Sequence, residues 1–394
     1  MRIAVASSGL GHVARGIESW AADLGAALAE RGEAVTLFAG GETSGRWYER
    51  SVPCWRRDSK EAQRVVRWLP SRGLWRLGLA TGYGVEQATF ALRLIGRLRR
   101  GAFDVLHVQD PQVASIVCRA RRLGLVRTRT VLAHGTEEPL DFLKRFTYLQ
   151  HLAPWHLEQA RAAGVWRPTW TAIPNFIDTE TFRPGRADAL RAELGIPAGS
   201  PVVLTAAAIK SHHKRIDYLI DEWARLADAS DGLSARLVVA GGREAETDAL
   251  VAAGRARLGD RVTFLVGFPR SRMPELYRAA DAFVLCSLAE MMPIALIEAA
   301  ASGLPCLVND HPVLRWVVGP GGETVDMARP GALAAALAPL LADPARRRAA
   351  GERGRRHCED AFGRDRVVDR IVAYYRRVLE PAPSTPAPVP EAVR

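Results

Sequence analysis

Short apolar segments alternate with longer amphipathic ones along most of this chain. In the first half, a helical segment at 15–31 accompanies apolar runs at 3–7, 34–39, 105–109 and 130–134. A second series of apolar runs follows at 202–208, 236–241, 262–267, 282–287 and 305–309. Apolar runs that alternate with helices are typical of buried parallel strands joined by crossover helices. The pattern therefore predicts an α/β protein with two Rossmann-like, doubly wound parallel-sheet domains.

The length of the chain agrees with two domains. It has 394 residues, 48% of them hydrophobic, which is more than one core commonly holds. The segment at 173–185 is rich in residues that favour turns, so it is predicted to join the domains. We therefore expect domains at 1–175 and 176–363. The tail at 381–394 is rich in Pro and Ala and poor in large apolar residues, and it is expected to be disordered.

In one predicted βαβ unit, at 282–309, the sequence indicates where a ligand could bind, at the start of the helix. A helix is predicted to open at Pro293 and to end near Gly303, because Pro suits the first helical position and Gly suits a left-handed stop. The first amides of this helix, those of Ile294 and Ala295, have no partner within it. Together with the helix dipole they form a place where a diphosphate could bind.

Two carboxylates, Glu290 and Glu298, flank this expected anion site. A carboxylate beside a phosphate is unfavourable unless it has another task, and accepting hydrogen bonds from the hydroxyls of a sugar and a ribose would be one. A solvated helix face would also explain two glutamates at this spacing. The sequence Glu290-x7-Glu298 resembles the E-x7-E signature of retaining glycosyltransferases of the GT-B fold, family 4 type, including the residues that follow it, Ala299, Ala300, Gly303 and Pro305.

The resemblance implies a hexosyltransferase-class enzyme that moves a sugar from a nucleotide-diphosphate sugar to an acceptor, with retention of configuration. It implies two domains that face each other across a cleft, with the acceptor on the N-terminal side and the helix at 364–379 packed back on that domain. Glu290 would be catalytic and position sugar hydroxyls, Glu298 would bind the ribose diol, and a phosphate oxygen would accept the acceptor's proton. The donor is a substrate, and no cofactor is implied.

Two basic residues are candidates for binding the diphosphate. Lys214 matches a lysine that the family uses for this purpose and is assigned a catalytic role, because a leaving diphosphate gains charge in the transition state. The family's arginine is absent near Ala208, and Lys210 could supply the missing charge or belong to a solvated basic loop. The family's usual glycine is also replaced near Pro293, which has no N–H to give, so the donor contact is expected to shift to the next two amides.

Further candidates lie at other strand ends. His134 follows an apolar strand and resembles a family histidine near the donor sugar, where a neutral imidazole could act catalytically. A purely structural histidine is an equal alternative. Gly267 and Phe268 resemble the donor-binding loop that covers the nucleobase. The first strand-to-helix turn forms a predicted cleft loop, which could contact the acceptor or the phosphate through Gly9, Gly11, His12 and Arg15.

Other features exclude several classes of site. The chain contains no Asp-x-Asp pair, so no metal is expected to hold the diphosphate. His212 and His213 are adjacent and diverge, so they are not predicted to bind zinc, and five scattered cysteines imply no disulfides. Neither a signal peptide nor an apolar run long enough to span a membrane is visible, which predicts a cytoplasmic protein.

Positive charge is concentrated in residues 45–101. This segment has thirteen Arg or Lys and four Asp or Glu, 13 − 4 = +9, compared with +11 for the whole chain. Aromatic residues are interleaved with the charge, at Trp47, Tyr48, Trp55, Trp68 and Trp75. Basic side chains with Trp are typical of segments that bind anionic membrane surfaces. We expect a peripheral position on the inner membrane face and a lipid-linked or polysaccharide acceptor of the cell envelope, although a solvated basic surface explains the pattern nearly as well. No nucleic-acid motif accompanies the charge.

The fold by itself leaves other functions open. A sugar-nucleotide epimerase or a phosphorylase can use the same two-domain frame, and a degenerate, non-catalytic scaffold at the membrane would fit the missing arginine. Donor sugar, nucleobase and acceptor are not readable from these residues.

Overall fold

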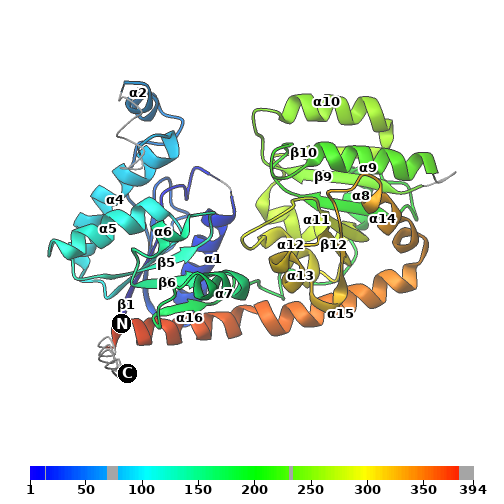
Figure 1. The fold of residues 1–394 in the computed structure, drawn as a ribbon. Helices are drawn as coiled ribbons and strands as arrows, with labels where there is room; N and C mark the ends of the chain where they lie inside the picture. Colours follow the sequence, from blue (N-terminus) through cyan, green and yellow to red (C-terminus); the bar gives the residue numbers. More distant parts are fainter. Residues whose placement is uncertain (14, 69–78, 230–233, 381–394) are drawn as a thin grey trace, which may run out of the picture.

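Two parallel β-sheets, one in each half of the chain, organise the protein (Figure 1). The computed structural model describes residues 1–13, 15–68, 79–229 and 234–380. Within them, the N-terminal sheet has seven strands in the order β3-β2-β1-β4-β5-β6-β7, all paired in parallel. The strands are β1 (Arg2–Ser7), β2 (Ala34–Ala39), β3 (Glu49–Ser51), β4 (Val105–Val108), β5 (Arg129–His134), β6 (Tyr148–His151) and β7 (Trp170–Ala172).

The C-terminal sheet repeats this plan with six strands among the described residues. Their order is β10-β9-β8-β11-β12-β13, and every pairing is again parallel. The strands are β8 (Val202–Ala206), β9 (Arg236–Gly241), β10 (Val262–Val266), β11 (Ala282–Leu285), β12 (Cys306–Asn309) and β13 (Gly322–Val325). The prediction of two doubly wound parallel-sheet domains is therefore confirmed.

Helices cover both faces of the sheets. In the N-terminal domain they are α1 (Gly16–Glu30), α2 (Lys60–Trp68), α4 (Gly82–Gly101), α5 (Pro111–Arg122), α6 (Leu140–Leu143) and α7 (Pro154–Ala162). Beyond them come α8 (Asp188–Glu193), α9 (Ile216–Ala229), α10 (Thr247–Leu258), α11 (Met273–Ala279), α12 (Ile294–Ala301), α13 (Pro312–Val318), α14 (Ala332–Ala342), α15 (Pro344–Phe362) and α16 (Arg364–Leu379). Short 3₁₀ turns are η2 (Gly259–Arg261), η3 (Arg270–Arg272) and η4 (Gly319–Gly321). Alternate residues of β1 enter different cores, Ile3 with α1 and Ala4 with α4 and α5, because successive strand side chains point to opposite faces.

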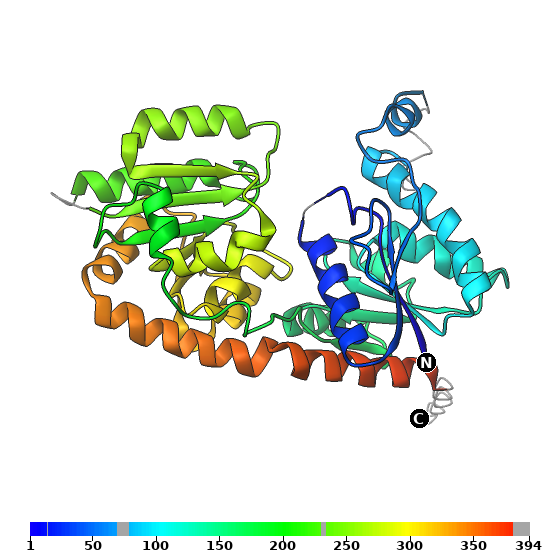
Figure 2. The same ribbon diagram turned by 180° about the vertical axis from the view of Figure 1, so that it is seen from behind.

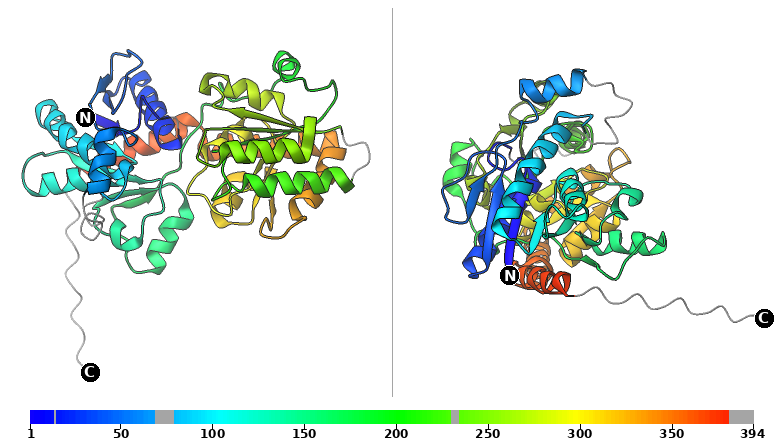
Figure 3. Two further views of the ribbon diagram at one scale, coloured as in Figure 1. Left: turned by 90° about the horizontal axis from the view of Figure 1, so that it is seen from above. Right: turned by 90° about the vertical axis from the view of Figure 1, so that its left-hand side faces the viewer.

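The helix α16 belongs by position to the N-terminal domain. It contacts α1 and β4, and the hydroxyl of Tyr375 lies 2.6 Å from Nδ1 of the buried His107. A backbone bridge between Ile177 and Gly363 ties the interdomain segment to the junction of α15 and α16. Figure 3 shows the two domains side by side, and Figure 2 shows α15 and α16 running along one side of both. In this arrangement the chain passes between the domains twice, at the interdomain segment and at this junction.

Four strands were not predicted from the sequence. The strands β3, β6, β7 and β13 are only three or four residues long, and β3 (ERS) and β6 (YLQH) are partly polar. An apolar pattern of three or four residues cannot be distinguished from that of a loop. The predicted opening of the helix at Pro293 is wrong by one residue: Pro293 is the N-cap, with ψ of 110°, and α12 begins at Ile294.

The order of strands in each sheet reverses at one point. The reversal lies between β1 and β4 in the N-terminal sheet and between β8 and β11 in the C-terminal sheet. Crossover helices leave in opposite directions from such a pair, which opens a crevice at the carboxyl ends of the two strands. Polar residues that follow these four strands are therefore the first place to look for a site.

Candidate active site

The loop between β11 and α12 brings Glu290 to the β8/β11 reversal. Its carboxylate forms an ion pair with Lys214, which comes from the turn between β8 and α9. Both side chains are largely enclosed, 10% exposed for Glu290 and 19% for Lys214. The structure therefore brings together Glu290 and Lys214, two of the three residues that were predicted to be catalytic, from separate motifs.

The turn that carries Lys214 has an unusual backbone. His213 and Arg215, on either side of the lysine, have φ of +70° and +53°, a region that residues with a Cβ seldom adopt. His213 Nε2 donates to the carbonyl oxygen of Ala289 (3.1 Å), beside Glu290. Burial lowers the pKa of His213, so it is not a fixed positive charge near neutral pH. The backbone is thus held in a strained form that points Lys214 at the loop after β11.

Lys210 lies in the same turn, but its ammonium has no ion-pair partner among the described residues. It is half-buried, and its carbonyl oxygen accepts from the amide of Ile216 (3.2 Å). Ala208, where the resemblance leads one to expect an arginine, is half-buried and has no basic side chain. The cations of the turn are therefore Lys210, the paired Lys214, and Arg215, whose guanidinium donates to the Met327 carbonyl oxygen (2.6 Å) and stacks on Tyr218.

The amino end of α12 faces the N-terminal domain. The amides of Ile294 and Ala295 precede the first bonds within the helix, which run from Leu296 and Ile297 to the carbonyl oxygen of Pro293. A Cβ placed on Gly16, at the start of α1, would lie 3.8 Å from Ile294 Cδ1. Both candidate amides thus belong to a helix end that is close to the other domain.

Glu298 is almost fully buried, with 1% of its side chain exposed. Its Oε2 accepts from the hydroxyl of Tyr277 at 2.8 Å, and its Oε1 forms an ion pair with Arg270. Burial raises the pKa of Glu298, and the Arg270 charge and the Tyr277 hydrogen bond offset only part of that shift. A solvated helix face, the alternative reading of the paired glutamates, is wrong for both Glu290 and Glu298. Whether Glu298 binds a ribose stays a prediction.

Arg270 was not predicted from the sequence. It comes from the turn η3 after β10, two positions beyond Phe268, and only the strand-end position of a basic residue could have pointed to it. Gly267, with φ of +72°, donates its amide to Gly241 at the end of the neighbouring strand (2.8 Å). Phe268 is half-buried, and the Arg272 guanidinium lies 5.4 Å from its ring centre. These two predicted donor-binding residues lie in the connection that presents Arg270 to α12.

The predicted cleft loop is anchored inside the N-terminal domain. A Cβ on Gly9 would lie 2.1 Å from Glu18 Oε1, and Gly11 has φ of +90° against the backbone of Glu42. His12 Nε2 donates to Glu86 Oε2 at 2.9 Å, with 6% and 0% of the two side chains exposed. The prediction that His12 could contact a ligand is not supported by this arrangement, because its ring is enclosed.

A buried polar network surrounds that loop, and the sequence analysis missed most of it. Arg57 donates to Glu86 at 2.6 Å and stacks on Tyr83, 4.4 Å from the ring centre. Asp110, after β4, accepts from the hydroxyls of Ser8 (3.0 Å) and Tyr83 (2.9 Å). The position of Asp110 directly after an apolar strand was the one signal in the sequence. Arg57 and Glu86 come from a loop and a helix with no motif.

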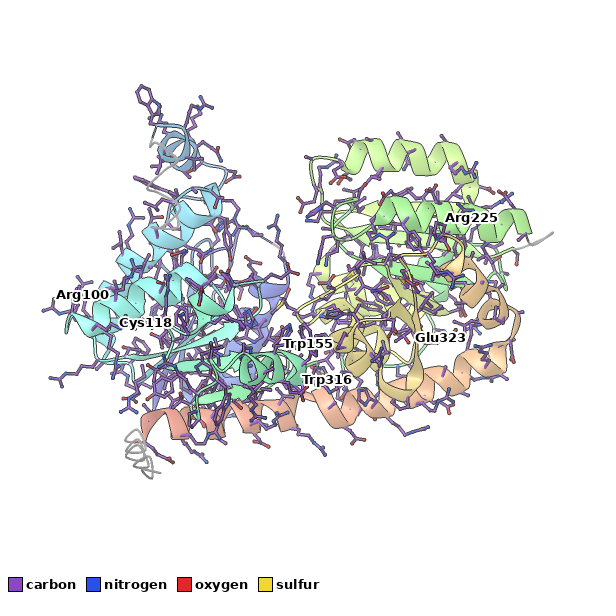
Figure 4. The ribbon with its side chains drawn as sticks, in the orientation of Figure 1. Arg100, Cys118, Trp155, Arg225, Trp316 and Glu323 are labelled. Carbon is purple, nitrogen blue, oxygen red and sulfur yellow. The ribbon has the colours of Figure 1, made fainter. Side chains whose placement is uncertain are left out.

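Arg15 differs from the rest of the cleft loop because it reaches the other domain. Its guanidinium lies 3.2 Å from Glu244, which follows β9. Other contacts between domains are the Asn175 amide with the Met292 carbonyl oxygen (3.3 Å) and the edge-on rings of Trp155 and His311 (5.3 Å). Figure 4 places Trp155 at the side of the N-terminal domain that meets the C-terminal domain. The loop after β1 and the loop before α12 therefore face each other.

His134 ends β5 and belongs to a cluster of three buried histidines. Its Nδ1 lies 3.1 Å from Nδ1 of His151, and the ring of His156 is 5.6 Å away. Burial lowers the pKa of His134 and His151 to about 3 and that of His156 to about 4, so all three are neutral at physiological pH. Among the described residues, no group of three or more His, Cys, Asp or Glu side chains is placed to hold a metal ion. The structural alternative for His134 is favoured by these contacts.

The basic segment at 45–101 is only partly a surface. Trp47 and Trp68 are 67% and 81% exposed, but Tyr48 is buried, so its predicted place in an interfacial face is wrong. Arg57 is also internal. Trp75 and the other residues at 69–78 lie outside the described residues. Figure 1 shows α2 at the tip of the N-terminal domain, on the side away from α16. Within the part of the chain that the structure describes, none of the helices is long and apolar enough to span a bilayer.

Comparison with known proteins connects both halves of the chain to one family. Residues 14–181 match the family described as Glycosyltransferase Family 4, and residues 187–357 match the family described as Glycosyl transferases group 1. D-inositol 3-phosphate glycosyltransferase 1 of Catenulispora acidiphila is 33% identical over 315 residues, covering 72% of this chain and 75% of that one. The D-inositol 3-phosphate glycosyltransferase of Segniliparus rotundus is 30% identical over 288 residues, covering 69% of this chain and 63% of that one.

Solved structures agree with this fold. Sucrose-phosphate synthase of Thermosynechococcus elongatus superposes with a TM-score of 0.77 at 22% identity, covering 96% of this chain and 98% of that one. The Anabaena protein Alr3699/HepE, in complex with UDP-glucose, has a TM-score of 0.74 at 15% identity, with 96% and 100% covered. At these identities the likeness establishes the two-domain GT-B fold.

Proposed function

The chain belongs to the group 1 glycosyltransferases of family 4, and on that premise we propose that it transfers a sugar from a nucleoside-diphosphate sugar to an acceptor hydroxyl. The observation that carries the proposal is the meeting of Lys214 and Glu290 beside the first amides of α12. A cation, a carboxylate and unbonded amides at one strand-order reversal are the groups that a diphosphate and a sugar require. The UDP-glucose bound by Anabaena HepE supports the same class of donor.

Each group has a distinct task in this reaction. The bond between the anomeric carbon and the diphosphate oxygen breaks, and Lys214 together with the amides of Ile294 and Ala295 stabilises the charge left on the diphosphate. Glu290 accepts hydrogen bonds from sugar hydroxyls once Lys214 turns to the phosphate. Glu298 accepts from the ribose diol and Lys210 adds positive charge. Gly267 and Phe268 border the nucleobase.

Retention of configuration and independence from metal ions are part of the proposal. The resemblance to retaining enzymes supports attack of the acceptor oxygen on the face from which the diphosphate leaves, with a phosphate oxygen taking the acceptor's proton. Lysines and helix amides can neutralise a diphosphate without a divalent cation. Proton NMR of the first product formed would identify its anomeric configuration, and activity in excess EDTA would test the need for metal.

The donor is the part of the proposal to test first. Purified protein is mixed with a panel of nucleotide-sugars, and thermal shift and donor hydrolysis are measured for each. We expect one donor to raise the melting temperature and to be hydrolysed slowly, and Glu290→Gln to abolish the hydrolysis. A protein that neither binds nor hydrolyses any member of the panel would contradict the proposal. Release of a sugar phosphate only in the presence of inorganic phosphate would indicate a phosphorylase.

For the acceptor we propose a lipid or lipid-linked molecule at an anionic membrane surface. The support is the exposed tryptophans of the N-terminal domain and the exposed Arg64 and Arg67 on α2. Each cation close to anionic headgroups contributes about 1 kcal/mol. In liposome flotation we expect binding to anionic but not to neutral vesicles, and loss of that binding in a variant with Arg64→Gln, Arg67→Gln and Trp68→Ala.

The matched control removes equal charge elsewhere. Arg348 and Arg356 are exposed on α15, and their replacement by Gln should leave flotation unchanged. Wild-type protein that stays soluble with anionic vesicles at low salt would contradict the membrane proposal and favour a soluble acceptor.

A further inference from the structure

Arg270 occupies a position between the ribose-binding candidate and the other domain. Its guanidinium pairs with Glu298 on α12 and lies 5.5 Å from the ring centre of Phe182, yet 45% of its side chain stays exposed. Asp23 of α1 is near enough to be influenced by this charge: burial raises the pKa of Asp23, and the charge of Arg270 opposes that shift. Figure 2 shows α1 on the side of the N-terminal domain that faces the C-terminal domain. Arg270 is therefore placed between α12 and α1.

The same guanidinium is close to the expected diphosphate. Glu298 follows Ile294 by four residues, so the two lie on one face of α12, about 6 Å apart along its axis. The first amides of α12 are at Ile294 and Ala295. A guanidinium held at Glu298 is thus one helical turn from those amides, while its extended side chain remains partly open to solvent.

The candidate site has few cations for a diphosphate. The turn after β8 has no arginine at Ala208, and Lys214 is already paired with Glu290. Phosphates are well matched by arginine, because a guanidinium has five N–H donors in a planar fork. The contact with Glu298 and the stacking on Phe182 leave other donors of Arg270 available. Its position, exposure and chemistry all suit a phosphate oxygen.

The neighbouring Arg272 shows that this placement is specific. It comes from the same 3₁₀ turn, but its guanidinium is turned to α8 and α11, where it pairs with Glu193 (2.7 Å) and Glu275 (3.0 Å). Both of these contacts lie within the C-terminal domain and away from Glu298. Two arginines two residues apart therefore have different surroundings, and Arg272 is a matched control.

We propose that Arg270 binds the diphosphate of the donor and supplies the guanidinium that is missing at Ala208, since Arg215 in the same turn is bonded to Met327 and stacked on Tyr218. The inference rests on the proposed function, since it needs a nucleoside-diphosphate sugar. The proposal also links the diphosphate to the ribose. Arg270 contacts Glu298 Oε1 and Tyr277 contacts Oε2, so a ribose bound by Glu298 must share this carboxylate with the arginine. The charged groups that face Arg270 are Glu298 and Asp23.

The test separates phosphate binding from ribose binding. By calorimetry, UDP, ADP and GDP are compared with uridine, adenosine and guanosine, using the base that binds wild-type protein most tightly. In Arg270→Ala the dissociation constant of the diphosphate should rise about 10- to 100-fold, the scale of charge-assisted hydrogen bonds, and that of the nucleoside less than about threefold. Arg272 lies over the ring of Phe268, so in Arg272→Ala any loss of affinity should be the same for the diphosphate and the nucleoside.

A second variant guards against loss of folding, because Arg270→Ala leaves the buried Glu298 without its cation. Arg270→Lys keeps a positive charge for Glu298 but loses the planar fork, so diphosphate affinity should still fall while circular dichroism stays unchanged. Equal losses for nucleoside and diphosphate, or wild-type affinity in both Arg270 variants, would overturn the inference alone. A wild-type protein that binds none of the three diphosphates would overturn the proposed function as well.

Discussion

At the β1/β4 edge of the N-terminal sheet, Glu86 holds Arg57 and His12 inside the protein, whereas beside the β8/β11 edge of the C-terminal sheet Glu298 of α12 holds Arg270, which stays partly open to solvent. Both edges are strand-order reversals, and both gather carboxylates with cations. They differ in what surrounds the pairs. The carboxylates Glu86 and Glu298 are both buried, but Arg57, which stacks on Tyr83, is 18% exposed, whereas Arg270 is 45% exposed.

This difference suggests a division of tasks between the two edges. A mostly enclosed pair has lost most of its water and has to be satisfied within the protein, so its effect is to order the loop that contains Gly9 and Gly11. A pair with an accessible cation can exchange its carboxylate for a phosphate when a ligand arrives. We therefore expect changes at the first edge to appear mainly in stability and changes at the second mainly in catalysis and binding.

The largest effect is expected for Glu86→Ala. This change removes the carboxylate that Arg57 hydrogen-bonds and, among the described residues, leaves only the Glu18 carboxylate, at 3.8 Å, beside it in a mostly buried site; breaking such a pair costs about 3 to 5 kcal/mol. Urea denaturation should give a free energy of unfolding lower by that amount, while Glu61→Ala, an exposed acid on the neighbouring α2, should leave it nearly unchanged. A stable Glu86→Ala protein with lost activity would contradict the comparison, because the N-terminal network would then act in the reaction.

The next effect is on turnover, in Lys214→Ala. If its ammonium stabilises the leaving diphosphate, kcat should fall about 10²- to 10³-fold with a smaller change in donor KM, since that contact strengthens as charge develops. Steady-state kinetics with the identified donor measures both. Lys144→Ala, which removes an exposed lysine paired with Asp141, is the control. A variant that kept its rate and lost only affinity would make Lys214 a ground-state contact.

The pH dependence of stability should reveal the buried acid Glu18. Burial raises its pKa from 4.5 to about 7. As the pH rises, this group ionises in the unfolded chain before it ionises in the folded protein. The folded protein therefore loses stability between about pH 4.5 and about pH 7. Above that range the full loss is on the order of 3 kcal/mol. The free energies of unfolding of wild-type protein and of Glu18→Gln should diverge between pH 5 and 8, and the variant should become more stable relative to wild type as the pH rises. Parallel curves would indicate an ordinary pKa.

The smallest of these effects is expected for Glu298→Gln. The variant keeps the size of the side chain but replaces one acceptor oxygen, so donor affinity should fall by about 1 to 3 kcal/mol with the fold intact. Calorimetry with the donor measures this, and Glu275→Gln on α11 is the control. Unchanged affinity would remove the ribose assignment and would leave the carboxylate as a partner of Arg270 and Tyr277 alone.

The local pattern of residues was sufficient to predict most elements and to single out two candidate residues that the structure brings together. Apolar runs gave most of the long strands, and the Pro and Gly around α12 placed that helix to within one residue at its start. Glu290 and Lys214 were found because each follows a strand in a recognisable motif. The short strands β3, β6, β7 and β13 escaped because three or four partly polar residues carry no clear period.

The sequence by itself determined the two parallel-sheet domains, since buried strands and covering helices are encoded by hydrophobic period over short distances. Only the tertiary structure decided which charges meet. Arg57 is 29 residues from Glu86 and Arg270 is 28 residues from Glu298, and no spacing rule connects residues on different elements. It also decided which side chains are enclosed: His12 and Tyr48 occur in segments that read as surface, but the packing of neighbouring elements buries both. The reason is that pairing and burial depend on how elements pack against one another, and that packing is set by the whole fold.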